Sequence, residues 1–374
     1  MRRQALVVGA GLAGLTCAHL LAGHGWDIEL WDLGARRAPP LLLNDGTVWL
    51  LRDLWRGADD LAGGAVRLRA RTVRWGNSPE VTVEHAGMVV DGESLRQRLL
   101  ARLPSAHPGR VRLAEVGPAG LTGRLAGVDP GVQVVDASGR RAHAATVLGQ
   151  SERRVLGRRC VLAAQASLAE PCAPEGCWME TVRGGWIFLA PAEVGQGVLQ
   201  AMVPAWPEDP ESTLRRMLAE ARLIRGRVGA LAGPVTVLPA APECSDPLLG
   251  AGWIAVGDAA IALDPVSGDG TGHGLRGAVL AASTLDAVAS GRLDRSCLGH
   301  YHARLVEALR VHLQRCLAYY SAASFSPTWQ GERAAIAQAL QAMAGSPGAP
   351  VQLRYALRGS QLVPLRASPR GSIR

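Results

Sequence analysis

Glycines at fixed spacing near the N-terminus are the first residues in this chain whose types point to a specific chemistry. They form the motif Gly9-Ala10-Gly11-Leu12-Ala13-Gly14, which follows an apolar segment at residues 4–8 and opens a helical pattern at 12–22. The first glycine permits a tight turn, the second lets backbone approach a pyrophosphate, and the third lets the helix pack closely on the strand. The helix N-terminus then directs free N–H groups at the phosphates.

A carboxylate follows this motif at a useful distance. Asp32 ends the next apolar strand, at residues 27–31, where a ribose-binding carboxylate is expected. Glu29 is a rival, but its position in the middle of the strand makes it less suitable. The combination predicts a dinucleotide site, and by itself it does not separate FAD from NAD.

A second glycine-rich stretch begins at Trp253 and reads WIAVGDAAIALDPVSGDGTGHGLRGAVLAA. A short apolar strand ends there in Gly-Asp, and an Asp-Pro turn and several glycines then open a helix of small residues. Glycines let backbone amides approach a flat ring, and a helix N-terminus stabilises the negative charge of a reduced flavin. We expect the cofactor to be contacted by Gly257, Asp258, Pro265, Gly268, Gly270, Thr271 and Gly272.

With both motifs present in this order, the chain resembles the FAD-dependent group A monooxygenases, the p-hydroxybenzoate hydroxylase-like superfamily that includes flavin halogenases. In that family the Asp of the Gly-Asp pair binds the ribityl chain, which maps to Asp258, and the turn after Asp264-Pro265 wraps the isoalloxazine ring. The resemblance covers about residues 4–320 and implies bound FAD. No second nucleotide fold is recognisable, so electrons are expected from NAD(P)H directly or through a separate flavin reductase.

Two other stretches match the family less closely. Asp136, in Val135-Asp136-Ala137-Ser138-Gly139-Arg140, resembles the Asp-Gly element of the superfamily and is a further candidate for cofactor binding. The alternative is an ordinary turn, because Asp, Ser and Gly favour turns after strands. Relatives often carry an arginine just before the helix expected at 93–103, where this chain has Asp91-Gly92-Glu93. A phosphate contact at that point is therefore in doubt.

The basic residues narrow the choice of flavin chemistry. All 40 are arginine, and the chain contains no lysine. Flavin halogenases use a lysine to relay the oxidised halide, whereas arginine stays protonated. The halogenase pattern Trp-x-Trp-x-Ile-Pro is also missing, and Trp186-Ile-Phe-Leu-Ala-Pro191 is the nearest stretch. Halogenation is disfavoured, which leaves oxygenation through a flavin C4a-hydroperoxide, or dehydrogenation by an oxidase, as the expected reaction.

Oxygenation of an electron-rich ring needs mainly a dry and shaped pocket. Five residues of the strand-rich regions are candidates to line it, and core packing is the alternative for the aromatic ones: Glu84, Trp178, Glu180, Trp186 and Phe188. His85 and His273 are weak candidates for catalytic residues, because histidine is the usual general base near neutral pH. A surface histidine is the alternative for His85.

A looser resemblance concerns the substrate. The Asp-Pro-x-Ser-Gly-Asp-Gly-Thr-Gly form and Cys316-Leu-Ala-Tyr-Tyr320 look closest to the flavoproteins that mature cysteine tryptophylquinone enzymes. That subgroup implies hydroxylation of a tryptophan within a peptide or partner protein. A free aromatic metabolite remains an alternative, and so does a protein in which bound flavin is only structural.

Composition limits the other partners. The formal charge of +8 could attract an acidic partner, but the arginines are spread along the chain without a basic block, so nucleic-acid binding is not expected. No apolar run is long enough to span a bilayer. The seven cysteines are scattered without a CxxC pair. We therefore expect no metal site and a cytoplasmic protein with free thiols.

The order of elements predicts an α/β fold in which a doubly wound FAD-binding domain is interrupted by an antiparallel-sheet substrate domain. Residues 1–66, 91–160 and 250–290 are assigned to the FAD-binding domain, and residues 67–90 and 161–249 to the substrate domain. Residues 291–374 are expected to form a C-terminal helical region and tail. Within the substrate domain, a helix is expected at about 211–224.

Overall fold

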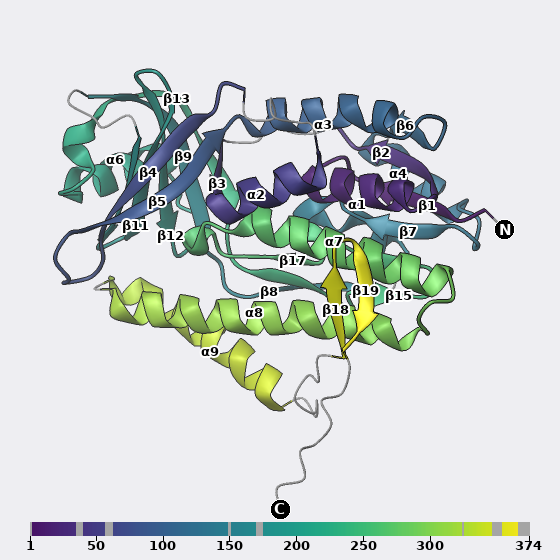
Figure 1. Ribbon diagram of the computed structural model, residues 1–374. Coiled ribbons are helices and arrows are strands. Elements are labelled where there is room, and N and C mark those ends of the chain that lie inside the picture. Colours follow the sequence, from purple (N-terminus) through teal and green to yellow (C-terminus); the bar gives the residue numbers. More distant parts are fainter. Residues whose placement is uncertain are drawn as a thin grey trace, which may run out of the picture.

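Two sheets side by side, with helices packed around them, make up the molecule (Figure 1). The computed structural model describes residues 2–34, 40–56, 63–148, 151–169, 175–323, 325–345 and 354–365. The end of the expected C-terminal tail, residues 366–374, lies outside these ranges.

The first sheet has the order β15-β16-β7-β1-β2-β6. Its neighbours are parallel except for the β15–β16 pair. Helices cover a parallel sheet on both faces, which explains why the residues of β1 from Ala5 to Val8 are all buried. The strands are β1 (Gln4–Val8), β2 (Asp27–Asp32), β6 (Val111–Glu115), β7 (Gln133–Asp136), β15 (Leu249–Gly250) and β16 (Trp253–Ala255).

The second sheet has the order β13-β9-β12-β11-β10-β4-β5-β3 and is antiparallel except for the pair β10–β4. β3 lies within the segment assigned to the FAD-binding domain, yet it pairs with β5 in this sheet. The strands are β3 (Leu41–Asn44), β4 (Val66–Arg74), β5 (Val81–Val90), β9 (Cys160–Leu168), β10 (Gly176–Val182), β11 (Gly185–Glu193), β12 (Gln196–Val203) and β13 (Val228–Pro239). A small third sheet contains β8 (Glu152–Val155), β14 (Glu243–Asp246) and β17 (Ile261–Ala262).

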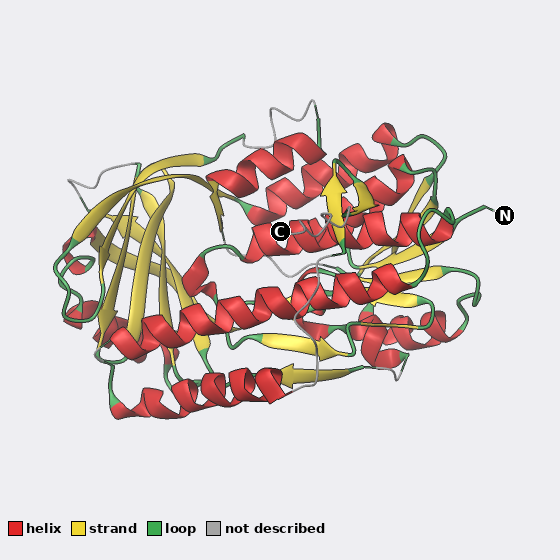
Figure 2. Cartoon of the chain, turned by 60° about the horizontal axis from the view of Figure 1, so that its bottom comes forward, coloured by secondary structure: helices red, strands yellow, loops and turns green. Residues whose placement is uncertain are grey.

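Helices surround the first sheet, and the long α8 runs from beside the second sheet along the length of the first (Figures 1 and 2). The α-helices are α1 (Leu12–Gly23), α2 (Asp45–Leu54), α3 (Gly92–Ala106), α4 (Pro118–Ala126), α5 (His143–Val147), α6 (Pro210–Glu220), α7 (Gly270–Ala289), α8 (Ser296–Ala322) and α9 (Gln330–Gly345). Short 3₁₀ turns are η2 (Gly139–Arg141), η3 (Arg225–Arg227), η4 (Gly257–Ala259), η5 (Pro265–Ser267) and η6 (Pro327–Trp329).

The α/β fold class expected from the sequence is confirmed, with C-terminal helices, but one local expectation was wrong. The helix expected up to residue 224 ends at Glu220, because the Glu180 carboxylate accepts hydrogen bonds from the backbone N–H groups of residues 222–224 and turns the chain. The C-terminal region also contains a hairpin, β18 (Tyr355–Arg358) and β19 (Gln361–Pro364). It packs on α7, where the Ser283 hydroxyl donates to the Ser360 carbonyl over 2.8 Å.

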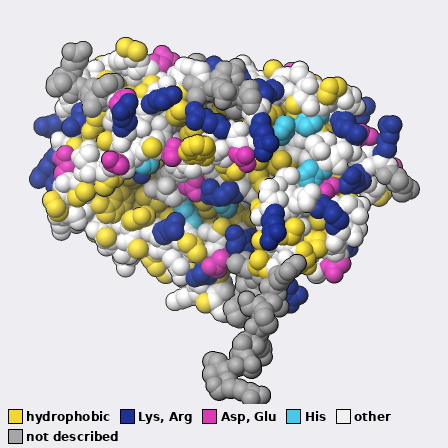
Figure 3. Space-filling view, viewed as in Figure 1, with side chains coloured by type: hydrophobic (Ala, Val, Ile, Leu, Met, Phe, Trp, Pro, Cys, Tyr) yellow, Lys and Arg dark blue, Asp and Glu magenta, His cyan; other side chains and the backbone are white. Residues whose placement is uncertain are grey.

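The surface carries arginine side chains that are dispersed among acidic and apolar ones on the face shown in Figure 3. Within the described ranges, none of the helices combines the length and the apolar character needed to cross a membrane.

Candidate functional site

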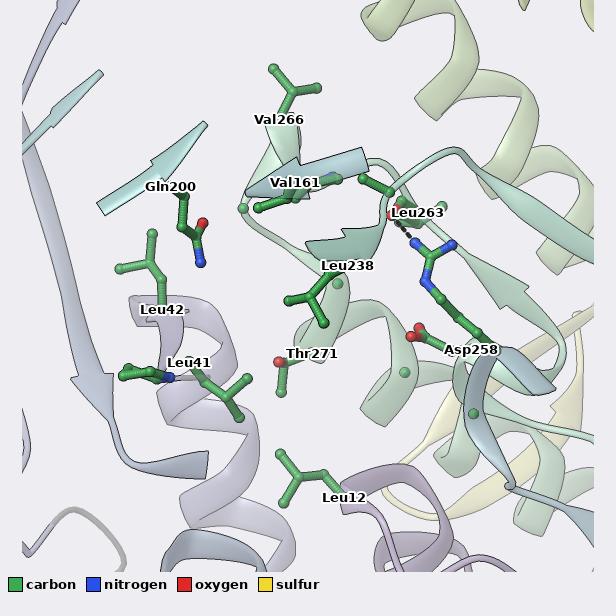
Figure 4. A pocket seen from close by; sticks show the side chains of 18 of the residues that line it. Leu12, Leu41, Leu42, Val161, Gln200, Leu238, Asp258, Leu263, Val266 and Thr271 are labelled. Carbon is green, nitrogen blue, oxygen red and sulfur yellow. Dashed lines mark hydrogen bonds between the residues drawn. The ribbon is translucent and has the colours of Figure 1, made fainter. Parts of the chain in front are cut away.

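A cavity of about 510 Å³ lies where the ends of the first sheet face the second sheet (Figure 4). One wall consists of backbone-rich turns at the ends of β1, β7 and β16 and at the start of α7. The opposite wall consists of side chains from β9–β12, with Leu41 and Leu42 of β3 beside them. The cavity therefore joins both glycine motifs to the substrate-side sheet.

The glycines of the N-terminal motif have two different roles: two of them allow close packing of the backbone, and one keeps the cavity open. A Cβ on Gly9, whose φ is +111°, would lie 2.4 Å from the Ala137 carbonyl oxygen, and a Cβ on Gly14 would lie 2.0 Å from that of Gly9. A Cβ on Gly11 would meet no atom within 4 Å. Gly11, Leu12 and Ala13 line the cavity, whereas Gly9, Gly14 and the buried Ala10 do not. The outer glycines thus shape the turn, and Gly11 keeps space at the start of α1.

The Gly-Asp pair at the end of β16 presents a carboxylate to the cavity. Gly257 has a φ of +60°, and the Asp258 side chain is accessible from the cavity. Loss of solvation among the surrounding protein atoms raises the pKa of the Asp258 carboxyl. The cations of Arg140 and Arg153 oppose this rise. Both arginines pair with Glu243 over 2.9 Å, and Arg153 also donates to the Asp258 carbonyl. The two arginines therefore fix the turn, and the Asp258 carboxylate stays accessible to a ligand.

The Asp-Pro turn rests on a buried ionic cluster. Asp264 accepts hydrogen bonds from the Val266 N–H at 2.9 Å and from the Tyr320 hydroxyl at 2.8 Å. Arg159 donates its Nε–H to Asp264 over 2.9 Å and also pairs with Glu332 of α9. The side chains of Arg159 and Asp264 are fully buried. This cluster ties the cavity-lining Pro265 turn to α8 and α9.

The start of α7 also keeps space beside the cavity. Gly270 and Thr271 line it, and a Cβ on Gly270 would meet no atom within 4 Å. Gly272 does not line the cavity and instead allows close packing, because a Cβ added there would lie 2.4 Å from the Thr47 hydroxyl oxygen. Asn44 donates to Asp269, the N-cap residue of α7, at 3.1 Å and fixes this end of the helix.

The residues present fit an FAD molecule. Gly11, Gly139 and Gly270 all lie on the cavity, and a Cβ on any of them would meet no protein atom within 4 Å. Backbone without side chains at three separate turns is the surface that a pyrophosphate and a flat ring require. Gly11 to Ala13 would hold the pyrophosphate, Asp258 the ribityl hydroxyls, and the turn from Pro265 to Thr271 the ring.

Two acidic candidates lie outside the cavity lining. Asp32 ends β2, where its carboxylate accepts from Arg96 at 2.8 Å and from the Gly34 N–H at 3.2 Å. Arg96, one turn into α3, thus places a guanidinium close to the expected ribose carboxylate. Asp136 is fully buried, and its oxygens accept from Ser138 and from the Ala145 N–H. Asp136 therefore holds its own turn, and the neighbouring Gly139 and Arg140 reach the cavity.

On the sheet side, Trp186 and Phe188 line the cavity, but Trp178 and Glu180 do not. Adjacent side chains of a strand point to opposite faces. Met179 is paired with Phe188 and shares its face, so Trp178 and Glu180 face the other way. Trp178 packs in a second core cluster with residues of α6, and Glu180 caps the turn after that helix. The expectation that these two residues line the pocket was wrong.

Several lining residues on this wall carry no motif in the sequence. Met179, Gln200, Val161 and Leu238 lie on the cavity face of β10, β12, β9 and β13. The signal that identifies them is strand register, because each lies on the same face as Trp186 or Phe188.

Glu84 and His85 of β5 also lie outside the cavity lining, and the Glu84 side chain is exposed. His85 accepts a hydrogen bond at Nε2 from Arg71 over 3.0 Å. Partial burial and the charge of Arg71 lower the pKa of His85. Arg71 itself lines the cavity, so His85 acts on the site only by holding this guanidinium.

His273 is buried in the first turns of α7 and does not line the cavity. Burial and the charge of Arg276 lower the pKa of His273 to about 4. The imidazole is therefore neutral at pH 7 and does not reach the cavity. Within the described part of the chain, His273 is therefore not placed to act as a base on a substrate in this cavity.

This burial predicts a dependence of stability on pH. The pKa of His273 rises from about 4 in the folded chain to about 6.5 in the unfolded chain, so the unfolded chain binds more protons between these values. The stability contributed by the neutral, buried imidazole is fully present above pH 6.5 and is lost as the pH falls towards 4. We expect the melting temperature of His273→Asn to fall less than that of wild type when the pH is lowered from 7 to 4.5. Equal losses would contradict this assignment.

Comparisons with known proteins agree with this architecture. A family model described as an NAD(P)-binding Rossmann-like domain matches residues 7–37, and no curated protein matches the chain by sequence. The flavin-dependent halogenase CmlS is similar in structure, with a TM-score of 0.73 and 19% identity over 89% of this chain and 68% of that one.

Two oxygenases are similar as well. The peptidyl tryptophan dihydroxylase QhpG has a TM-score of 0.67 and 20% identity, over 98% of this chain and 86% of that one. The p-nitrophenol 4-monooxygenase PnpA from Pseudomonas putida DLL-E4 has a TM-score of 0.67 and 17% identity, over 92% of this chain and 96% of that one. The chain therefore has the fold that FAD-dependent monooxygenases share with flavin-dependent halogenases.

Proposed function

We propose that the protein is an FAD-dependent monooxygenase that hydroxylates an electron-rich aromatic ring. The observation that carries this proposal is the single cavity that joins the open glycine turns to the apolar face of the second sheet. When bound, FAD supplies the redox chemistry, including the reaction of its reduced form with oxygen. Electrons come from NAD(P)H, either directly or through a separate flavin reductase.

The protein's own part is to position the ring and to exclude water. Trp186, Phe188, Val161 and Leu238 give the substrate wall an apolar surface. His85 and His273 lie outside the lining, so the chain offers no histidine to a bound substrate within the described part of the cavity. An oxygenation that depends on a dry, shaped pocket fits this wall better than a reaction that needs a strong general base.

Halogenation is the rival activity, because several structurally similar proteins are halogenases. The chain has no lysine, and the cation on the cavity wall at β4 is Arg71. A guanidinium remains protonated at working pH and cannot take part in halide relay as an amine can. This difference favours hydroxylation. An FAD-dependent oxidase or dehydrogenase of a small metabolite remains the second candidate.

For the substrate we propose an indole ring, free or as a tryptophan within a peptide or protein. The support is the similarity to QhpG, whose described substrate is a peptidyl tryptophan, together with the form of the Asp-Pro and glycine turn. The substrate proposal is more specific than the proposed reaction, and an experiment can disprove it while the monooxygenase assignment stands.

The test begins with the purified protein, which should show flavin absorption and release FAD on denaturation, as identified by mass. With NADH, a flavin reductase, oxygen, bromide and indole-containing peptides, we expect products heavier by one or two oxygen atoms. Bromination at one ring position that depends on the folded protein would overturn the proposal. Hydrogen peroxide as the only oxygen product, with a desaturated substrate, would support the oxidase instead.

A further inference from the structure

Among the described side chains of the second sheet that line the cavity, Gln200 is the neutral polar one. It pairs with Phe188 on β11 and with Ala163 on β9, so the three side chains share a face. Phe188 pairs in turn with Met179. Gln200 therefore lies in the middle of a row that crosses four strands and is otherwise apolar.

The Gln200 amide has no partner within the part of the chain that the structure describes. It makes no hydrogen bond with a described residue, and it extends from β12 into the cavity on the side opposite Asp258 (Figure 4). An amide that loses its water without gaining another partner destabilises a complex. A ligand that fills this half of the cavity must therefore offer a hydrogen-bonding group to Gln200.

The nearest charged alternative lies elsewhere on the wall. Arg71 also lines the cavity, but one of its terminal nitrogens is held by His85. The same terminal nitrogen lies beside the glycine turn, since a Cβ on Gly268 would lie 3.6 Å from it. The arginine thus lies beside the glycine turn of the cofactor wall. None of the residues paired with Gln200 is charged, so a charged ligand group at Gln200 would meet no opposite charge from these neighbours.

We propose that Gln200 is a specificity-determining residue that hydrogen-bonds the ring N–H of an uncharged aromatic substrate. Its amide oxygen accepts from this group, while Phe188 and Met179, which follow Gln200 along the row, contact the ring. The inference rests on the proposed function, because it names the chemistry of the substrate in the same cavity.

A pair of isomeric probes tests this assignment. 3-Methylindole keeps the ring N–H, and 1-methylindole has a methyl group in its place, so the two differ in this donor but not in formula. We expect the purified wild-type protein to bind 3-methylindole about tenfold more tightly in calorimetric titrations, as one hydrogen bond in a poorly hydrated site provides. Gln200→Leu should bind both isomers equally, because its affinity for 3-methylindole falls while its affinity for 1-methylindole stays unchanged.

Gln165→Leu is the matched control, because Gln165 lies on the adjacent strand β9 with an exposed side chain that does not line the cavity. It should keep the tenfold preference. Gln200→Met, which is close to glutamine in shape, provides a second variant if the leucine variant does not fold. A wild-type protein that binds the isomers equally, or a preference that survives in both Gln200 variants, overturns the inference.

The titration separates this inference from the proposed function, because it measures binding and needs no turnover. Absence of FAD or of any oxygenated product, together with a preference that depends on Gln200, would remove the monooxygenase and leave the recognition role. Oxygenation of aromatic substrates without a role for Gln200 would do the reverse.

Discussion

Gly11→Val should fold like wild type and fail to retain FAD. Gly11 has φ of −75° and ψ of 174°, an extended conformation that valine adopts readily, and its Cβ would enter open space in the cavity. The added side chain would occupy the place of the pyrophosphate and keep it from the N–H groups of α1. We expect the affinity for FAD to fall about 100-fold, the equivalent of one or two hydrogen bonds to a charged group.

Two glycine variants serve as comparisons. Gly14→Ala should lower the stability of the apoprotein by about 1–3 kcal/mol, because its Cβ would overlap the Gly9 carbonyl oxygen. Gly123→Ala, on the exposed surface of α4, should leave the FAD affinity unchanged and should not lower stability, because alanine favours a helix more than glycine does. Equilibrium dialysis with FAD and melting of the apoproteins measure both effects. A Gly11→Val protein that binds FAD as wild type does would show that the cofactor does not contact this turn.

Arg159→Met should cause the largest loss of stability among single substitutions in the cluster behind the Asp-Pro turn. Arg159 has a fully buried side chain that pairs with Asp264 and Glu332, and these charges raise its pKa against the opposing effect of burial. Removing it leaves two carboxylates with little access to water and no cation. Breaking such a pair costs about 3–5 kcal/mol.

The neighbouring Arg158 provides the control, because its side chain is exposed. Arg158→Met should change the free energy of unfolding by no more than about 0.5 kcal/mol. The double variant Arg159→Met/Asp264→Asn should lose less stability than the sum of the two single variants, since it removes both members of one pair. Urea denaturation of the apoproteins measures these values. Equal stability of the Arg158 and Arg159 variants would contradict the buried ion pair.

The sequence by itself determined the elements whose information is local. The glycine spacing at residues 9–14 and the apolar runs around it predicted β1, α1 and β2 close to their observed ends. The Gly-Asp pair and the glycine turn after Asp264 predicted a second wall of the same site, and Gly257, Asp258, Pro265, Gly268, Gly270 and Thr271 all line the cavity. Such signals can be read because a φ above zero, a tight turn or a helix start restricts which residues fit at each position.

Only the tertiary structure decided which polar side chains reach the cavity. Asp136 and Glu180 are both carboxylates in or beside a strand, yet each is used within the fold, one by its own turn and one by a turn more than forty residues away. Gln200 carries no sequence signal of its own and reaches the cavity through its pairing with Phe188. The physical reason is that a strand exposes alternate residues to opposite faces, so function depends on sheet register and on partners distant in the chain.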